Sequence, residues 1–167
     1  SFDGYMDTLL QCVRSLRRAG FTKFFFLNGH GGNTGPNGIV TRILKEEEPD
    51  TIVGHSGYFD YIPDAVLQEV MEGPLKQIRH ACEAEASMVM HLHPDLVRKE
   101  RLRDDGLQTE PSVRGLTLLF DELTEQGSYG YGTLATSEKG KRLFEAAVAG
   151  ATKEIGAIAD GFVLKGI

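Results

Sequence analysis

The stretch that decides the fold is TKFFFLNGHGGN, residues 22–33. Its first half is apolar and aromatic, bounded by glycine and too short for a core helix, which predicts a short buried strand over residues 22–27. The second half is rich in glycine and predicts a sharp turn whose backbone approaches a ligand closely. His30 lies in this turn, where an imidazole with one free nitrogen can bind a metal or carry a proton. A turn whose histidine is merely exposed is the alternative.

Helical patterns flank this strand. Apolar residues recur at intervals of three and four over residues 6–18 and again over residues 37–48, and a second short strand is expected over residues 51–54. This order predicts an α/β fold, a three-layer α/β/α sandwich with a mostly parallel sheet, whose ligands gather at the carboxyl ends of the strands. We further expect loops over 58–63, 104–110 and 127–132, helices over 65–71, 83–91 and 137–159, and a closing strand over 162–164. Ser137 is expected to cap the last helix.

Composition limits the classes of function. The 167 residues, 41% of them hydrophobic, contain no linker, so one domain over residues 1–167 is expected. The formal net charge of -6 offers no basic stripe for nucleic acid or an anionic membrane surface, which leaves a small-molecule substrate or a protein as partner. No apolar run reaches the length of roughly 18 residues that a membrane-spanning helix needs. The two cysteines are expected to be reduced and the chain cytoplasmic.

A nucleotide-binding loop is a rival interpretation of the glycine-rich turn. Gly29 and Gly31 follow a strand and precede a helix, as a dinucleotide fingerprint requires. Thr34 occupies the place of the third glycine, however, and no lysine stands between Leu27 and Thr41. Both nucleotide motifs are therefore incomplete.

A second candidate segment is HACEAEAS, residues 80–87, at the start of a predicted helix. Acidic residues in a first helical turn are stabilised by the helix dipole, so capping is one interpretation of Glu83 and Glu85. If the chain turns between His80 and Glu85, the two side chains face one pocket and offer a carboxylate ligand for a metal and an imidazole for proton transfer.

Together these motifs resemble the creatininase (creatinine amidohydrolase) family. The resemblance rests on the order and spacing of NGHGGN at residues 28–33, HACEAEAS at 80–87, LHPDLV at 92–97 and ATSEKG at 135–140. It implies a centre of two divalent metals, zinc or manganese, that activates a water for attack on a C–N bond. It assigns His30 and Glu85 as metal ligands and His80 as the catalytic residue that transfers a proton to the leaving group.

The resemblance also implies contacts with the substrate. The residues assigned to them are Gly31, Gly32, Tyr58, Phe59 and Tyr129. For Tyr129 a solvent-facing turn is the alternative. Creatininase itself is expected to close its pocket with tryptophans, of which this chain has none, so creatinine is not the expected physiological substrate.

The predicted function is therefore that of a metal-dependent amidohydrolase of a small molecule. A non-catalytic binding or scaffold domain that kept the fold and lost the metals is the alternative. The family resemblance implies a homo-oligomer, a hexamer. Family members carry an earlier Glu-x-His motif and an aspartate that have no counterpart before His30. We accordingly expect the chain to be the C-terminal part of a longer enzyme, and to lack a complete two-metal site and hydrolytic activity by itself.

Overall fold

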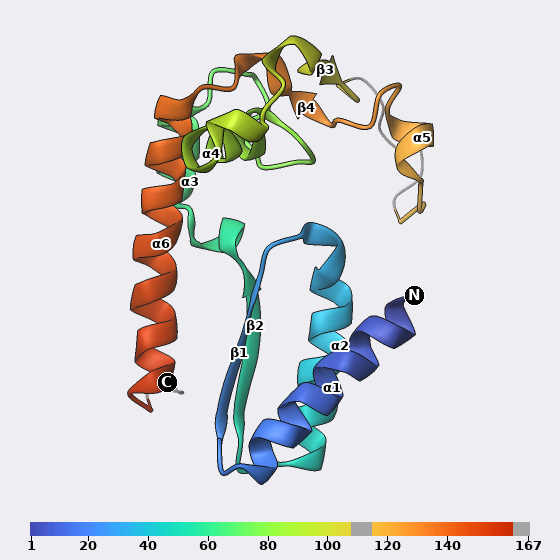
Figure 1. Cartoon of the computed structure of the whole chain (residues 1–167), viewed down its shortest axis with the longest axis vertical. Coiled ribbons are helices and arrows are strands. Elements are labelled where there is room, and N and C mark those ends of the chain that lie inside the picture. Colours follow the sequence, from blue (N-terminus) through green and yellow to red (C-terminus); the bar gives the residue numbers. More distant parts are fainter. Residues whose placement is uncertain (108–114, 162–167) are drawn as a thin grey trace. The chain divides into compact units, whose positions relative to one another are not determined.

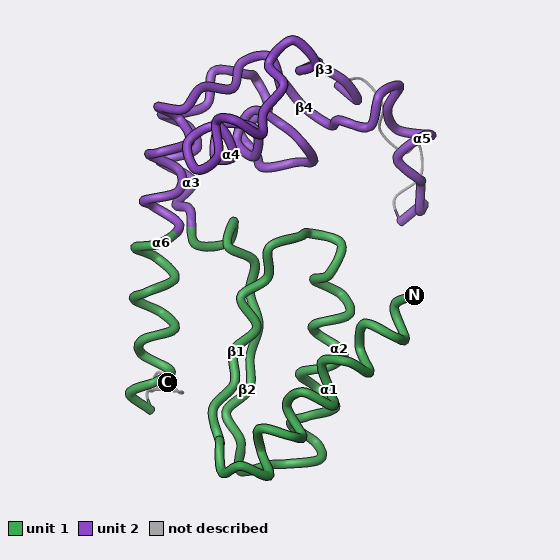
Figure 2. Tube along the Cα trace, in the orientation of Figure 1, with its two compact units in different colours: residues 1–61, 148–167 green, residues 62–147 purple. Residues whose placement is uncertain are grey.

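The structure, a computed structural model, describes residues 1–107 and 115–161. The chain forms two compact units, which are described separately (Figure 2). Unit 1 comprises Ser1–Tyr61 and Val148–Ile167, and unit 2 comprises Ile62–Ala147. The expectation of a single domain stays a prediction.

Unit 1 is built around a parallel pair of strands, as the sequence predicts. Strands β1 and β2 pair in parallel with Phe24 opposite Val53 and Phe26 opposite His55. In Figure 1 helices α1 and α2 lie on one side of this pair and the C-terminal part of α6 on the other, so the unit has three layers. In chain order its elements are α1 (Phe2–Arg18), β1 (Lys23–Asn28), the 3₁₀ helix η1 (Gly31–Asn33), α2 (Thr34–Glu47), β2 (Ile52–Gly57), the 3₁₀ helix η2 (Tyr58–Tyr61) and the end of α6 (Ser137–Ala159).

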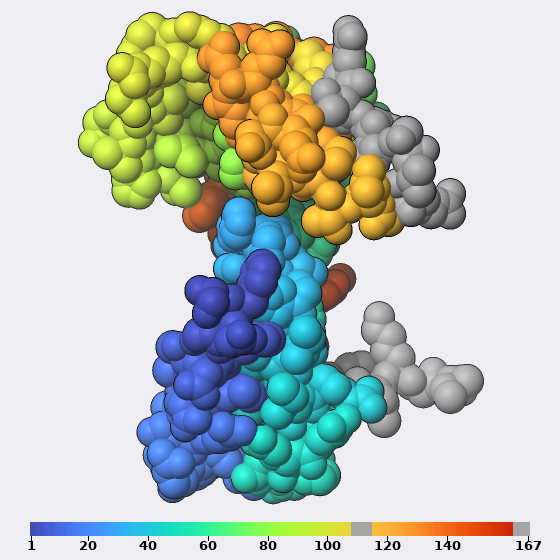
Figure 3. All heavy atoms as spheres, turned by 90° about the vertical axis from the view of Figure 1, so that its right-hand side faces the viewer, coloured from blue at the N-terminus to red at the C-terminus, as the bar shows by residue number. Residues whose placement is uncertain are grey.

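The helices of unit 1 are fixed by an apolar core and by charges at its rim. Side chains of α1 pack against those of α2 (Figure 3). The core cluster consists of Val13, Val40 and Leu44, against which partly buried apolar residues of α1, β1 and β2 pack. Arg14 of α1 forms an ion pair with Glu47, the last residue of α2. Arg17 of α1 forms ion pairs with Glu48 and Asp50, which follow α2. Most of the apolar stripe of α1 thus packs into a core shared with α2, β1 and β2.

Unit 2 contains shorter elements joined by long connections. Its only described strands are β3 and β4, a two-residue antiparallel pair. In chain order the elements are α3 (Asp64–Val70), α4 (Glu83–Leu92), the 3₁₀ helices η3 (Pro94–Leu96) and η4 (Lys99–Arg101), β3 (Asp104–Asp105), α5 (Phe120–Leu123), β4 (Gly130–Tyr131), the 3₁₀ helix η5 (Gly132–Leu134) and the start of α6.

Most expected elements are present, and several short ones were not expected, among them α5 and the 3₁₀ helices η1, η3, η4 and η5. Strands β3 and β4 occupy part of two segments expected to be loops, and a 3₁₀ helix replaces the loop expected after β2. Two-residue strands have no alternating pattern to read. The predicted closing strand at 162–164 and part of the loop at 104–110 lie outside the described residues. Within the described ranges, no helix has the length and apolar character needed to cross a bilayer.

Candidate functional site

The turn that carries His30 is held by the last residue of β1. The Asn28 side chain is buried, and its Oδ1 accepts a hydrogen bond from the His30 backbone N–H at 3.1 Å. Its Nδ2 donates to the His30 carbonyl oxygen at 2.7 Å and to the Thr34 hydroxyl at 3.5 Å. One amide thus satisfies both backbone groups of His30 and fixes the start of α2.

Of the glycines in this turn, only Gly32 is constrained by space, and none is required by an unusual backbone angle. Gly29, Gly31 and Gly32 are absent from the residues with positive φ, so the turn does not use the left-handed region. At Gly32 an added Cβ would lie 2.8 Å from the His30 Nε2, whereas at Gly31 it would meet nothing within 4 Å. A side chain at position 32 would therefore force the imidazole to move.

The aromatic pair Tyr58 and Phe59 follows β2 in unit 1. The two rings meet edge to face, with centroids 5.3 Å apart, and both residues are half-buried. The Phe59 ring fills the space above Gly57, where an added Cβ would lie 2.2 Å from it. Asp60 closes the turn by accepting hydrogen bonds from the Gly57 N–H at 2.7 Å and the Ser56 hydroxyl at 2.8 Å.

In unit 2 the chain turns sharply between His80 and the helix that contains Glu85. Ala81 has φ 47 and is the only described non-glycine residue with positive φ. Its backbone N–H donates to Glu85 Oε2 at 2.6 Å. Ala81 precedes Cys82, the N-cap of α4, so this hydrogen bond is not a capping box; it fixes the Glu85 side chain at the turn that follows His80.

His80 itself is positioned by two contacts. Its carbonyl oxygen accepts a hydrogen bond from the Tyr129 N–H at 2.7 Å, as part of an isolated antiparallel bridge. Its imidazole packs on the ring of Phe120, with centroids 4.4 Å apart. Tyr129, expected at the rim of the site, therefore pairs directly with the candidate catalytic histidine.

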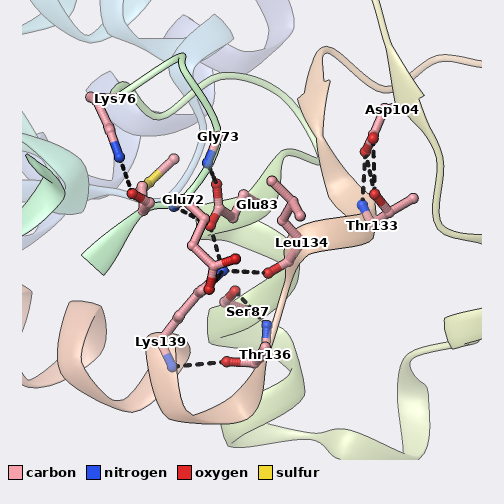
Figure 4. A network of polar contacts seen from close by, with 11 residues as sticks. Glu72, Gly73, Lys76, Glu83, Ser87, Asp104, Thr133, Leu134, Thr136 and Lys139 are labelled. Atoms are coloured by element: carbon pink, nitrogen blue, oxygen red, sulfur yellow. Dashed lines mark hydrogen bonds and ion pairs between the residues drawn. The ribbon is translucent and has the colours of Figure 1, made fainter. Parts of the chain in front are cut away.

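Glu83 is a buried acid that sequence reasoning treated only as a capping residue. Its carboxylate, 1% exposed, accepts hydrogen bonds from the Glu72 N–H at 2.8 Å, the Gly73 N–H at 3.0 Å and the Lys139 ammonium at 2.6 Å (Figure 4). Lys139 also donates to the Leu134 carbonyl at 2.6 Å and lies 3.0 Å from the Glu72 carboxylate. The network joins three separate segments of unit 2 at the start of α4.

The environment of Lys139 favours its charged form. Burial by itself lowers the pKa of Lys139, but hydrogen bonds to Glu83 and Glu72 outweigh it, so the net pKa lies above the ordinary value of 10.5. Buried charges of opposite sign in hydrogen-bonding contact are mutually dependent, since either one alone would be uncompensated. Glu83 and Lys139 are therefore expected to stabilise the fold only as a pair.

Helices α4 and α6 approach each other closely beside this network. A Cβ at Gly140 would lie 1.9 Å from the backbone oxygen of Ser87. The Ser87 hydroxyl accepts a hydrogen bond from the Thr136 N–H at 3.0 Å, and the Thr136 hydroxyl accepts one from the Lys139 N–H at 3.2 Å. Thr136 thus occupies the capping position expected for Ser137, because the helix begins at Ser137 and needs its cap one residue earlier.

The predicted site residues divide between the two units. Unit 1 holds His30, Gly31, Gly32, Tyr58 and Phe59, and unit 2 holds His80, Glu85 and Tyr129. Their assigned roles stay predictions. Within residues 1–107 and 115–161 there is no group of three or more His, Cys, Asp or Glu side chains that could hold a metal ion. One candidate ligand in each unit does not make up a two-metal centre.

Two supporting residues, Asn28 and Lys139, were not singled out from the sequence, and Glu83 was considered only as a capping residue. Asn28 could have been identified, because an Asn that bonds the backbone two residues on is a local signature of turns. The pairing of Glu83 with Lys139 spans 56 positions and carries no local signal.

Comparison with known proteins places the chain in a family. The sequence model of the creatininase family, described as creatinine amidohydrolase, matches residues 1–155, and the chain belongs to this family. It is 28% identical over 160 residues to the creatinine amidohydrolase of Pseudomonas putida, covering 90% of this chain and 62% of that protein.

Solved structures agree. A creatininase structure described as the Mn form is 26% identical, with a TM-score of 0.83, covering 98% of this chain and 66% of that chain. A mutant creatininase described as Zn-Zn type is 26% identical, with a TM-score of 0.78 and the same coverage. The chain thus spans a little under two thirds of the length of these relatives. The predicted α/β fold and family resemblance are confirmed.

Proposed function

We propose that this chain contributes to a metal-dependent amidohydrolase that cleaves a C–N, amide-like bond of a small molecule. The observation that carries the proposal is the turn at Ala81, which joins His80 to the helix of Glu85 through a 2.6 Å hydrogen bond. Strained backbone of this kind is concentrated at functional sites. The membership of the creatininase family supports the reaction type.

His80 is proposed to transfer a proton in this reaction. In hydrolysis a water oxygen adds to the carbonyl carbon, the C–N bond breaks, and the leaving nitrogen takes up a proton. A positioned imidazole can supply that proton near neutral pH, and such general acid catalysis contributes about 10²- to 10⁴-fold to the rate. Phe120 and the Tyr129 backbone hold the residue that would do so.

The requirement for a divalent metal, zinc or manganese and two ions per complete site, is part of the proposal. It is supported by relatives described as Mn and Zn-Zn creatininases. His30 and Glu85 are the proposed ligands. These two donors do not complete a centre by themselves. The role of His80 is therefore argued only from the residues of this chain.

The test compares metal content with turnover in three variants. His30→Ala and Glu85→Ala should each lower zinc or manganese bound per chain, measured by mass spectrometry of the dialysed protein. His80→Ala should keep the metal and lose about 10²- to 10⁴-fold in hydrolysis of a panel of cyclic amides and formamides. Metal loss confined to His80→Ala would reverse the assigned roles. Because the chain alone is expected to lack a complete site, the variants are also measured with the expected upstream segment restored, and a protein that then stays metal-free and inactive would favour the scaffold alternative.

A further inference from the structure

Arg79 is an exposed cation that immediately precedes His80. Its guanidinium carbon lies 5.2 Å from the centroid of the Tyr129 ring, within the range of a cation–π contact. Its backbone N–H donates to the Cys82 sulfur at 3.3 Å. Both the backbone and the charged end of this residue are therefore held, even though the side chain is exposed.

The aromatic ring that supports Arg79 belongs to the bridge partner of His80. Tyr129 and His80 form an antiparallel bridge through the 2.7 Å hydrogen bond between the Tyr129 N–H and the His80 carbonyl. Side chains of residues directly opposite in such a pair lie on the same face, with Cβ atoms about 4.5–5.5 Å apart. The Arg79 guanidinium thus lies over the ring of the residue that pairs with His80, one residue from the imidazole proposed to transfer the proton.

The charge of Arg79 is not neutralised within the described part of the chain. Arg79 forms no ion pair with any described Asp or Glu, as is also true of Arg18, Arg98, Arg101 and Arg103, but only Arg79 among the described arginines stacks on a described aromatic ring. This occurs in a chain whose formal net charge is -6. A guanidinium stacked on an aromatic face still presents its N–H groups in a plane that matches a carboxylate or a phosphate.

We propose that Arg79 is a specificity-determining residue that binds an anionic group, a carboxylate or phosphate-like group, on the molecule whose C–N bond is cleaved beside His80. This inference rests on the proposed function and names the class of its substrate. An anion held by Arg79 would place the rest of a small molecule next to the imidazole. Neutral amides of the same size would lack this anchor.

The experiment measures binding and hydrolysis of three matched probes by the full chain. N-formylglycine carries a carboxylate, N-formylaminomethylphosphonate carries a phosphonate, and N-formylglycinamide is neutral. Binding is followed by NMR through the Arg79 Nε–H signal and by calorimetry. A charge-assisted hydrogen bond is worth about one to two factors of ten in affinity, so Arg79→Met should weaken the anionic probes by roughly 10- to 100-fold.

The neutral probe should bind equally to wild type and Arg79→Met. Arg98→Met, which removes another exposed arginine of unit 2, serves as the matched control and should change nothing. A preference for the carboxylate or for the phosphonate distinguishes the two anionic classes.

Failure of the inference is distinguishable from failure of the proposed function. Equal binding of charged and neutral probes, no binding of either anionic probe, or equal losses in Arg79→Met and Arg98→Met would overturn the role of Arg79. Hydrolysis of all three probes without preference would leave the amidohydrolase standing and remove only the anionic substrate. Selective anion binding without hydrolysis would support Arg79 and count against the reaction.

Discussion

Replacing Lys139 by methionine is expected to destabilise the chain by about 3–5 kcal/mol, the range for removing one partner of a buried ion pair. The Glu83 carboxylate is 1% exposed and would keep only the Glu72 and Gly73 N–H donors. Glu83→Gln should cost less, roughly 1–3 kcal/mol, because Lys139 would keep the Leu134 carbonyl and the Glu72 carboxylate. The asymmetry follows from the charge of the remaining partners: Lys139 keeps a carboxylate, whereas Glu83 keeps only neutral N–H donors.

The double variant Glu83→Gln with Lys139→Met removes both charges and should be no less stable than Lys139→Met alone. The assay is urea unfolding followed by far-UV circular dichroism, since the chain has no tryptophan to report by fluorescence. Lys141→Met is the matched control on the same helix: its side chain is 60% exposed, and it should change stability by less than about 0.5 kcal/mol. A loss below about 1 kcal/mol for Lys139→Met would refute the buried-pair reasoning, because surface ion pairs reach that value.

Three further predictions concern glycines and an acid. Gly140→Ala places a Cβ 1.9 Å from a backbone oxygen of α4 and should lower the free energy of unfolding by about 3 kcal/mol or more, measured by thermal unfolding. The control, Gly156→Ala in the same helix, meets nothing within 4 Å and should raise the free energy of unfolding by about 0.5–1 kcal/mol. Equal effects of the two variants would contradict the packing. Gly32→Ala should shift the NMR signals of the imidazole in its turn, and unchanged signals would count against the 2.8 Å approach. Backbone N–H groups, that of Glu125 first, hold the pKa of Asp105 below its ordinary value of 3.8. The ionised Asp105 should therefore stabilise the fold fully above that pH, and this stabilisation should be lost as the pH falls below it. Asp105→Asn should make the free energy of unfolding less dependent on pH in this acidic range, and an unchanged dependence would show the contacts to be unimportant.

In unit 1 the helices were predictable from their periodic apolar residues, and the strands from short apolar runs. The apolar stripe predicted a helix over 6–18, and the observed helix begins at Phe2 because the Ser1 hydroxyl accepts a hydrogen bond from the Gly4 N–H. Strand β1 was predicted to within one residue at each end. Strands β3 and β4 were not predictable, since two residues show no periodicity and their pairing depends on contacts between distant segments.

Contacts in the candidate site can be predicted from sequence only where they are local. The hydrogen bond from the Ala81 N–H to Glu85 spans four residues, and the shared pocket expected for His80 and Glu85 stays a prediction. The buried role of Glu83 depends on Lys139, on a different helix, and acidic composition alone favoured the exposed capping interpretation. Arg79 gave no signal either, because its contact with Tyr129 joins segments that the sequence separates.

The Asn28 side chain also affects the entropy of any binding event at the glycine-rich turn. Fixing the backbone of one residue takes roughly 1–2 kcal/mol of conformational free energy. Because both backbone groups of His30 are already hydrogen-bonded to a buried amide, that ordering occurs when the protein folds. A ligand that meets the imidazole then encounters a preorganised loop, and its affinity is not reduced by the freezing of a flexible glycine-rich segment.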